Sequence, residues 1–272
     1  MVRVGLCTVS FSTVSVDEAL AIAAGAGAPG IELWGRGHLP EDAPHKEVAR
    51  VQRLIESQGL EIAAYGSYAR AGDAAWTSER FAGIIARAVD LGAPRIRVWA
   101  GATGSADAQP DDWTQAAATL TAWGELAAAR GVQLVVERHN NSLTDFGDAA
   151  LRLFTLIPHP AVRLNYQAPY PWTEQAYCAE LADDLRRYLP LSAHMHVQNF
   201  TRRDDGLVQV PVAEGLINFA MYDPLLAEAQ FDGWAMLEFL PDIPEISKVA
   251  LARRELASLG RLLDRKTGGL EI

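Results

Sequence analysis

The sequence predicts a closed (β/α)8 barrel, the TIM-barrel fold, formed as a single domain over residues 1–272. Three observations predict it. Short apolar runs recur along the chain and suit parallel strands that are buried on both faces. Segments rich in Ala, Leu, Glu and Arg separate these runs and read as helices. The length of 272 residues also fits one barrel, which takes about 250 residues.

Eight apolar runs are predicted as the strands of the barrel. In chain order they are Val2–Cys7, Gly30–Trp34, Glu61–Tyr65, Arg95–Ala100, Gln133–Glu137, Val162–Tyr166, Ala193–Val197 and Ala235–Phe239. Eight strand–helix units favour a closed barrel over an open doubly wound sheet, which is the second interpretation. Because no G-x-G-x-x-G motif follows the first strand, the dinucleotide-binding form of that open sheet has little support.

Helices are predicted where apolar residues repeat at spacings of three and four. The clearest cover Asp17–Ala26, Lys46–Gln58, Ser78–Leu91 and Trp113–Arg130. Ser15 with Glu18, and Thr77 or Ser78, are expected to cap helix starts. Glycines end the helices, at Gly27, Gly59, Gly92 and Gly131. Three further segments are predicted as loops: Pro40–Pro44, Ser105–Pro110 and the longer Arg202–Glu214.

The charge and cysteine content limit the function classes. The chain has 24 Lys and Arg against 34 Asp and Glu, a net charge of −10, which argues against a nucleic-acid partner. Two cysteines, Cys7 and Cys178, cannot build a disulfide framework, so a cytoplasmic protein is the simplest expectation. No signal peptide is expected at the N-terminus, and no apolar run is long enough for a membrane span.

Polar residues at the ends of the predicted strands are the candidates for chemistry, because a barrel carries its site there. Glu137 and Glu238 each close an apolar run, where a carboxylate is costly unless it is paired, protonated or bound to a metal. His194 and His196 point to the same side of an intervening strand. Two carboxylates and a histidine suggest a metal site, whereas a salt bridge from each Glu to a loop Arg is the simpler alternative.

At this point the chain resembles the xylose-isomerase-like TIM-barrel superfamily of sugar and sugar-phosphate isomerases and epimerases. The resemblance is carried by Gly30-Ile-Glu-Leu-Trp with His38-Leu-Pro, Val135-Val-Glu-Arg-His-Asn, His194-Met-His-Val and Met236-Leu-Glu-Phe. It implies one divalent ion (Mn, Mg, Co or Zn) bound by Glu137, Gln167, His196 and Glu238. His196 is favoured over His194, because the second histidine of such a pair is the usual ligand in this family.

The sixth and seventh strands depart from the family pattern. Gln167 stands where an Asp is expected and Tyr170 where a His is expected, while Gln198-Asn199 replaces a frequent Lys-Asp pair. A glutamine can coordinate a metal through its amide oxygen but carries no charge. The departures therefore allow a weaker metal site, a different metal preference, or a site that works without metal.

The resemblance implies a sugar or sugar-phosphate isomerase or epimerase that works through an enediolate. Glu137 and Glu238 would act as an acid–base pair, one removing a proton next to a carbonyl group and the other returning one. The expected substrate contacts are Trp34, His38, Asn140, Tyr170 and Arg202.

Other functions remain open at the level of sequence. A lyase or dehydratase that acts on a keto-inositol or keto-glycoside would use the same first proton transfer. The superfamily also contains abasic-site endonucleases, but the net charge and the six histidines of this chain argue against one. A non-catalytic sugar-binding barrel is the alternative from another class, motivated by Gln167 and Tyr170. A homodimer is the default expectation for assembly.

Overall fold

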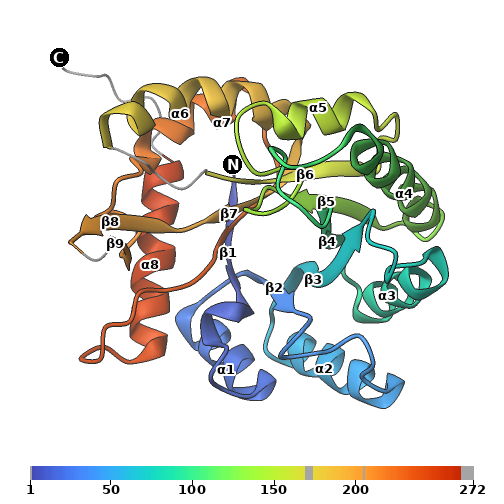
Figure 1. Cartoon of the computed structure of the whole chain (residues 1–272). Coiled ribbons are helices and arrows are strands. Elements are labelled where there is room, and N and C mark those ends of the chain that lie inside the picture. The colour runs from blue at the N-terminus through green and yellow to red at the C-terminus, as the bar shows by residue number, and fades with distance from the viewer. Residues whose placement is uncertain (1, 169–173, 205, 265–272) are drawn as a thin grey trace.

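The computed structural model describes residues 2–168, 174–204 and 206–264, with the backbone alone for 174–179. Eight parallel strands close into a barrel, in the order β1-β10-β7-β6-β5-β4-β3-β2, and helices surround it (Figure 1). The barrel strands are β1 Arg3–Cys7, β2 Gly30–Trp34, β3 Glu61–Ala71, β4 Arg95–Ala100, β5 Gln133–Glu137, β6 Val162–Gln167, β7 Ser192–Val197 and β10 Trp234–Leu237. The prediction of a single (β/α)8 TIM barrel as the fold class is confirmed.

Eight α-helices are found among the described residues. They are α1 Val16–Ala26, α2 His45–Ser57, α3 Ser78–Leu91, α4 Pro110–Ala128, α5 Ala149–Thr155, α6 Glu174–Tyr188, α7 Tyr222–Glu228 and α8 Lys248–Leu263. The predicted capping is confirmed: the side chains of Ser15 and Thr77 accept backbone hydrogen bonds at the starts of α1 and α3. Gly27 and Gly92 end the same helices with φ of 79° and 73°. No helix of the described residues is long and apolar enough to cross a membrane.

The prediction of a loop over Arg202–Glu214 is partly wrong. It contains most of an antiparallel hairpin, β8 Asn199–Arg203 and β9 Gly206–Val210, which projects from the barrel mouth (Figure 1). Asn199 fixes its base, because the Asn199 side-chain amide donates to the carbonyl oxygens of Val212 and Ile217 at 2.7 and 2.9 Å. Side-chain hydrogen bonding therefore orders a segment that composition alone suggested was irregular.

Two barrel strands differ most from their predicted bounds. β3 continues past Tyr65 to Ala71, with a register shift against β4, and so brings Ser67 and Tyr68 to the barrel mouth. β10 ends at Leu237, so Glu238 follows the strand, although its backbone N–H still donates to the β7 residue Val197 at 2.9 Å. The extra residues of β3 form part of one wall at the barrel mouth.

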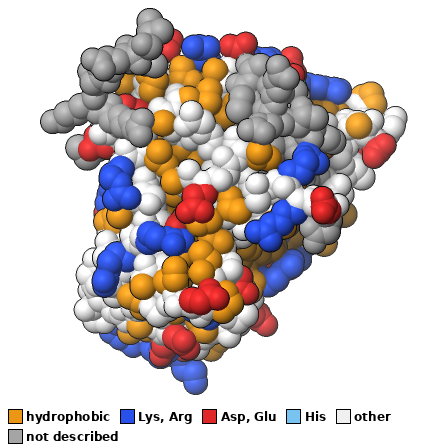
Figure 2. Space-filling model, turned by 90° about the vertical axis from the view of Figure 1, so that its left-hand side faces the viewer, with side chains coloured by type: hydrophobic (Ala, Val, Ile, Leu, Met, Phe, Trp, Pro, Cys, Tyr) orange, Lys and Arg blue, Asp and Glu red, His pale blue; other side chains and the backbone are white. Residues whose placement is uncertain are grey.

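The strands bury both of their faces, as their apolar runs predict. A large apolar core lies between the strands and the helices, and a smaller group of Cys7, Ala63, Trp234 and Met236 lies inside the barrel. Figure 2 shows the face that carries α8 and the hairpin, where the described Lys and Arg side chains alternate with Asp and Glu. This mixed surface agrees with the expectation from charge, although the absence of a nucleic-acid partner stays a prediction.

Candidate active site

Three of the predicted metal ligands meet at the carboxyl-terminal end of the barrel. Glu137 ends β5, His196 lies in β7 and Glu238 follows β10, and one ligand atom of each lies within 4.8 Å of those of the other two. All three side chains are buried, with exposed fractions of 1, 2 and 7%. The barrel thus gathers residues that are up to 101 positions apart into one cluster of oxygen and nitrogen donors.

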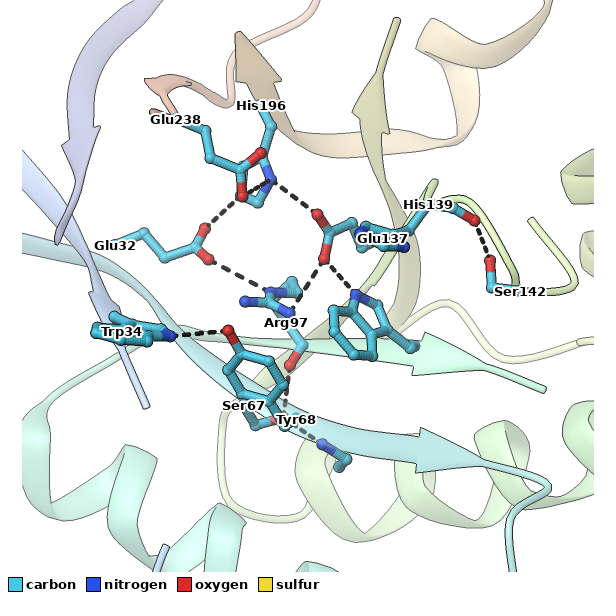
Figure 3. A network of polar contacts seen from close by, with 12 residues as sticks. Glu32, Trp34, Ser67, Tyr68, Arg97, Glu137, His139, Ser142, His196 and Glu238 are labelled. Atoms are coloured by element: carbon cyan, nitrogen blue, oxygen red, sulfur yellow. Dashed lines mark hydrogen bonds and ion pairs between the residues drawn. The ribbon is translucent and has the colours of Figure 1, made fainter. Parts of the chain in front are cut away.

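The orientation of His196 divides its two ring nitrogens between two sets of partners (Figure 3). Nδ1 faces a carboxylate oxygen of Glu137 at 3.2 Å and one of Glu238 at 3.4 Å, and Nε2 lies 2.9 Å from Glu32 Oε2. An ionised carboxylate only accepts hydrogen bonds. Nδ1 must therefore hold a proton or a cation between itself and the two carboxylates, because a bare lone pair there would face two negative groups.

The charges around this cluster shift its titration strongly. Burial alone lowers the pKa of His196, but Glu238 and Glu32 outweigh it and hold that pKa well above its usual value. Burial alone raises the pKa of Glu137, whereas Arg97 and the His196 hydrogen bond lower it to about 2. In the metal-free protein, therefore, a proton on His196 supplies the positive charge that the carboxylates require.

Gln167 is the residue that the family resemblance implies as the fourth ligand. It ends β6 and pairs in register with His196 on β7, and it is 6% exposed. Among the described residues, its amide oxygen is buried and has no hydrogen-bond partner. A buried acceptor without a donor is costly, so this oxygen fits a fourth ligand position. Glu137, Gln167, His196 and Glu238 together form an oxygen and nitrogen donor set that suits a divalent ion.

Sequence reasoning missed the residues that hold these candidate ligands. Arg97 on β4 lies 3.1 Å from Glu137 Oε2 and 3.5 Å from Glu32 Oε1, and it is almost fully buried. The indole N–H of Trp99 donates to the same Oε2 of Glu137. A signal was present, because Glu32 lies within an apolar run just as Glu137 closes one, and Arg95, Arg97 and Trp99 alternate along one strand.

Aromatic rings form a continuous wall at the barrel mouth (Figure 3). The Trp34 indole N–H donates to the Tyr68 hydroxyl at 2.8 Å, and Tyr68 packs edge-on against Trp99 with ring centroids 5.1 Å apart. Trp99 in turn packs against His139 at 4.9 Å. Such a wall suits the apolar C–H face of a ring-shaped or sugar-like molecule.

The remaining predicted substrate-contact residues differ in how deeply they are buried. His38 is buried with its ring nitrogens 2.9 Å from Thr8 Oγ1 and 3.3 Å from the Val14 carbonyl oxygen, which favours a supporting role beneath Trp34. Asn140 is half-buried after β5, and Arg202 is exposed on β8. Tyr170 lies outside the described residues. The substrate roles of Trp34, His38, Asn140, Tyr170 and Arg202 stay predictions.

Comparisons with known proteins identify relatives and similar structures of this chain. The chain is 25% identical to a 3-dehydroshikimate dehydratase of Bacillus anthracis, over 93% of this chain and 98% of that relative. It is 26% identical to an inosose dehydratase of Klebsiella pneumoniae, over 60% of this chain and 59% of that relative. The structure of an L-ribulose 3-epimerase superposes with a TM-score of 0.74 at 20% identity, covering 97% of this chain and 95% of the other.

The sequence profile of one family extends across most of the barrel. That family is described as the xylose isomerase-like TIM barrel, and its profile matches residues 20–262. The match includes every predicted ligand, from Glu137 to Glu238. The chain therefore belongs to the xylose isomerase-like TIM-barrel family.

Proposed function

We propose that this protein is a metal-dependent dehydratase that removes water from a cyclic hydroxy ketone. The observation that carries the proposal is the unequal environment of the two central carboxylates. Both oxygens of Glu137 are engaged, Oε1 by His196 and Oε2 by Trp99 and Arg97. Within the described part of the chain, Glu238 Oε2 has one donor, the side-chain amide of Gln198 at 3.4 Å.

This asymmetry leaves one carboxylate free to move a proton. Glu137 is held by charge-assisted contacts, and Arg97 and His196 lower its pKa, so it is a poor base and a good ligand. Among the described residues, the side-chain contacts found for Glu238 are longer, at 3.4 Å. A single base suits loss of water, in which the same group takes a proton from carbon and gives it to the departing hydroxyl. Epimerisation requires a proton to return on the opposite face, which favours two bases.

In the proposed reaction the protein positions the substrate and supplies one proton carrier, Glu238. A divalent ion held by Glu137, Gln167, His196 and Glu238 would polarise the carbonyl group of the substrate. Glu238 takes the proton from the carbon next to the carbonyl, and the electron pair moves toward the carbonyl oxygen. The carbon–oxygen bond at the next carbon then breaks, Glu238 returns the proton to the departing hydroxyl, and water leaves as a carbon–carbon double bond forms.

The two dehydratase relatives support this choice of reaction and suggest the substrates to try. Their names give 3-dehydroshikimate and inosose, which are both cyclic hydroxy ketones. The aromatic wall of Trp34, Tyr68 and Trp99 suits the face of a six-membered ring. An aldose–ketose isomerase is the second candidate, because moving a proton between adjacent carbons on one face also needs a single base.

The experiment is a turnover assay with the purified protein in added Mn²⁺ or Mg²⁺. Each of 3-dehydroshikimate, inosose and L-ribulose is offered separately, and the products are identified by mass spectrometry. We expect a product lighter by one water from at least one of the cyclic ketones. Products of unchanged mass, formed from L-ribulose alone, would favour the isomerase or epimerase alternatives. No conversion of any of the three, with metal bound, would contradict the dehydratase proposal for these substrates.

A further inference from the structure

A third buried carboxylate, Glu32, lies below the proposed metal ligands. It comes from β2, it is 3% exposed, and its Oε2 lies 2.8 Å from His194 Nε2 and 2.9 Å from His196 Nε2. Strands β1 and β10 separate β2 from β7 in the barrel, so this contact runs across the barrel interior rather than between paired strands. One carboxylate oxygen thus binds both histidines of the H-x-H pair.

These contacts determine which nitrogen of His196 keeps its hydrogen when a cation is bound. A carboxylate oxygen accepts hydrogen bonds, so an imidazole nitrogen that binds it must carry hydrogen. By this argument both nitrogens of His196 carry hydrogen in the metal-free protein, and Nδ1 is the one whose proton a cation beside Glu137 and Glu238 would replace. A metal-binding histidine commonly donates its other N–H to a carboxylate, which fixes both its tautomer and the angle of its ring.

We infer that Glu32 is a positioning residue of the metal centre, holding His196 by Nε2 so that Nδ1 points to the cation. The inference rests on the metal site of the proposed function and adds a residue to it. Glu32 acts through His196, because its Oε2 contacts Nε2, whereas Glu137 and Glu238 contact Nδ1.

The surroundings of Glu32 are built to keep it in place. Arg97 Nε lies 3.5 Å from Glu32 Oε1, and a Cβ at Gly66 of β3 would lie 2.8 Å from that oxygen. Any side chain at position 66 would therefore require the Glu32 carboxylate to shift. His194 adds a second contact to Oε2, so the carboxylate is fixed from both ends. A carboxylate this constrained is suited to orient a neighbour.

A competing role for Glu32 would be direct binding of a cation together with Cys7 and His196. Their ligand atoms are also close enough to hold one. Such a site would need the Cys7 thiolate, and it would leave the contact between Glu32 and His194 unexplained, because His194 is not in that group. Cys7 also packs with Ala63, Trp234 and Met236 in the apolar group inside the barrel. The orienting role accounts for both histidine contacts without requiring that thiolate.

The test compares Mn²⁺ binding by the wild-type protein, Glu32→Gln and Glu255→Gln, measured by titration calorimetry. Glu255 is a matched control: it is 2% exposed and binds the backbone N–H of Val212, outside the cluster of proposed ligands. We expect Glu32→Gln to weaken Mn²⁺ binding by about 10- to 100-fold and Glu255→Gln to leave it within about twofold. Thermal melts of the metal-free variants identify any that fail to fold.

A second measurement uses the wild-type protein and does not depend on a variant. In Zn²⁺-loaded protein with ¹⁵N-labelled histidine, long-range ¹H–¹⁵N spectra identify which nitrogen of His196 binds metal. We expect a metal-bound Nδ1 and a protonated Nε2, and in Glu32→Gln a loss of this single pattern. A global structural role for Glu32 would change stability but would not exchange the two nitrogens.

The outcomes separate this inference from the proposed function. If the wild-type protein binds Mn²⁺ and folded Glu32→Gln binds it equally well, the orienting role is wrong while the metal site stands. If Zn²⁺ binds Nε2 of His196, the orienting role is also wrong, whether or not Glu32→Gln folds. If the wild-type protein binds neither Mn²⁺ nor Zn²⁺, the proposed metal site is wrong and the role of Glu32 falls with it.

Discussion

The first four and the last four strands of the barrel contribute to the site in different ways. The later strands supply the proposed ligands, among them Glu137, His196 and Glu238. The earlier strands supply Arg97, which binds Glu137, and Glu32, which binds His196. The later half therefore determines which ion the site suits. The earlier half orients the proposed ligands and supplies the aromatic rings of Trp34, Tyr68 and Trp99.

The carboxylate of Glu32 on the earlier strands also offers a reason why the neutral Gln167, rather than an Asp, ends β6. Glu32, Glu137 and Glu238 carry three negative charges and Arg97 carries one positive charge, so two negative charges remain. One divalent cation would neutralise them with both histidines uncharged. An Asp in place of Gln167 would add a charge that nothing in this cluster compensates. The neutral amide thus fits a site whose first half already contains a third carboxylate.

The largest expected effect is a difference in turnover between variants of the two central carboxylates, Glu137 and Glu238. We expect Glu238→Gln to lower turnover by about 10²- to 10⁴-fold at saturating Mn²⁺, because it removes the proton carrier. Glu137→Gln should lose activity mainly through weaker metal binding, so raising Mn²⁺ should restore part of it. Steady-state assays at increasing Mn²⁺ measure both. Equal losses that no Mn²⁺ concentration relieves would support a paired acid–base mechanism instead.

Substitution of Arg97, the buried positive charge between Glu32 and Glu137, tests whether the earlier strands hold the proposed ligands by charge. Arg97→Met leaves Glu32 and Glu137 without their buried partner, and we expect it to destabilise the metal-free protein by about 3–5 kcal/mol. The control is Arg3→Met, which breaks the exposed pair with Glu61 and should cost less than about 1 kcal/mol. Urea unfolding gives both values. Similar losses in the two variants would show that the earlier strands do not hold the ligands by charge.

Metal binding should weaken as the pH falls. The pKa of His196 is raised in the metal-free fold, so its Nδ1 keeps a proton up to a higher pH than an ordinary histidine. A cation must displace that proton, and below the raised pKa the apparent Mn²⁺ affinity should fall about tenfold per pH unit. Titration calorimetry in buffers of different ionisation enthalpy also counts the proton released. No proton release near neutral pH would mean that Nδ1 is already unprotonated or is not a ligand.

The smallest effect concerns Gln167. Gln167→Asp adds a charged ligand, and we expect it to tighten Mn²⁺ binding by roughly tenfold while destabilising the metal-free fold. Gln167→Leu removes the oxygen donor and should weaken binding. Calorimetry and thermal melts on both variants measure these opposite changes. If neither variant alters Mn²⁺ affinity, the unpartnered oxygen of Gln167 is not a ligand.

The barrel could be predicted well from the sequence because the signals for its strands and helices lie within each element or next to it. Apolar runs mark the strands, and Ser15 and Gly27 mark the ends of a helix within a few residues of it. The hairpin was missed although Asp205-Gly206 is a turn signal between two short strands, because those strands are only half apolar.

The site was predicted only in part because most of its contacts are not local. Glu137 and Glu238 stand out as carboxylates at the ends of apolar runs. Glu32 has the same signal, but its partner His196 lies 164 residues away and on a strand that is not its neighbour. Arg97 likewise pairs with two carboxylates from separate strands. Closure of the barrel creates these contacts, and spacing along the chain does not encode them.

The central claim is that residues of the later strands converge on one divalent ion. Anomalous diffraction from a crystal soaked with Mn²⁺ tests it most directly. We predict a single strong peak about 2.0–2.3 Å from Glu137, Gln167 Oε1, His196 Nδ1 and Glu238. A peak elsewhere, or no peak at a Mn²⁺ concentration that saturates binding in solution, would contradict the account.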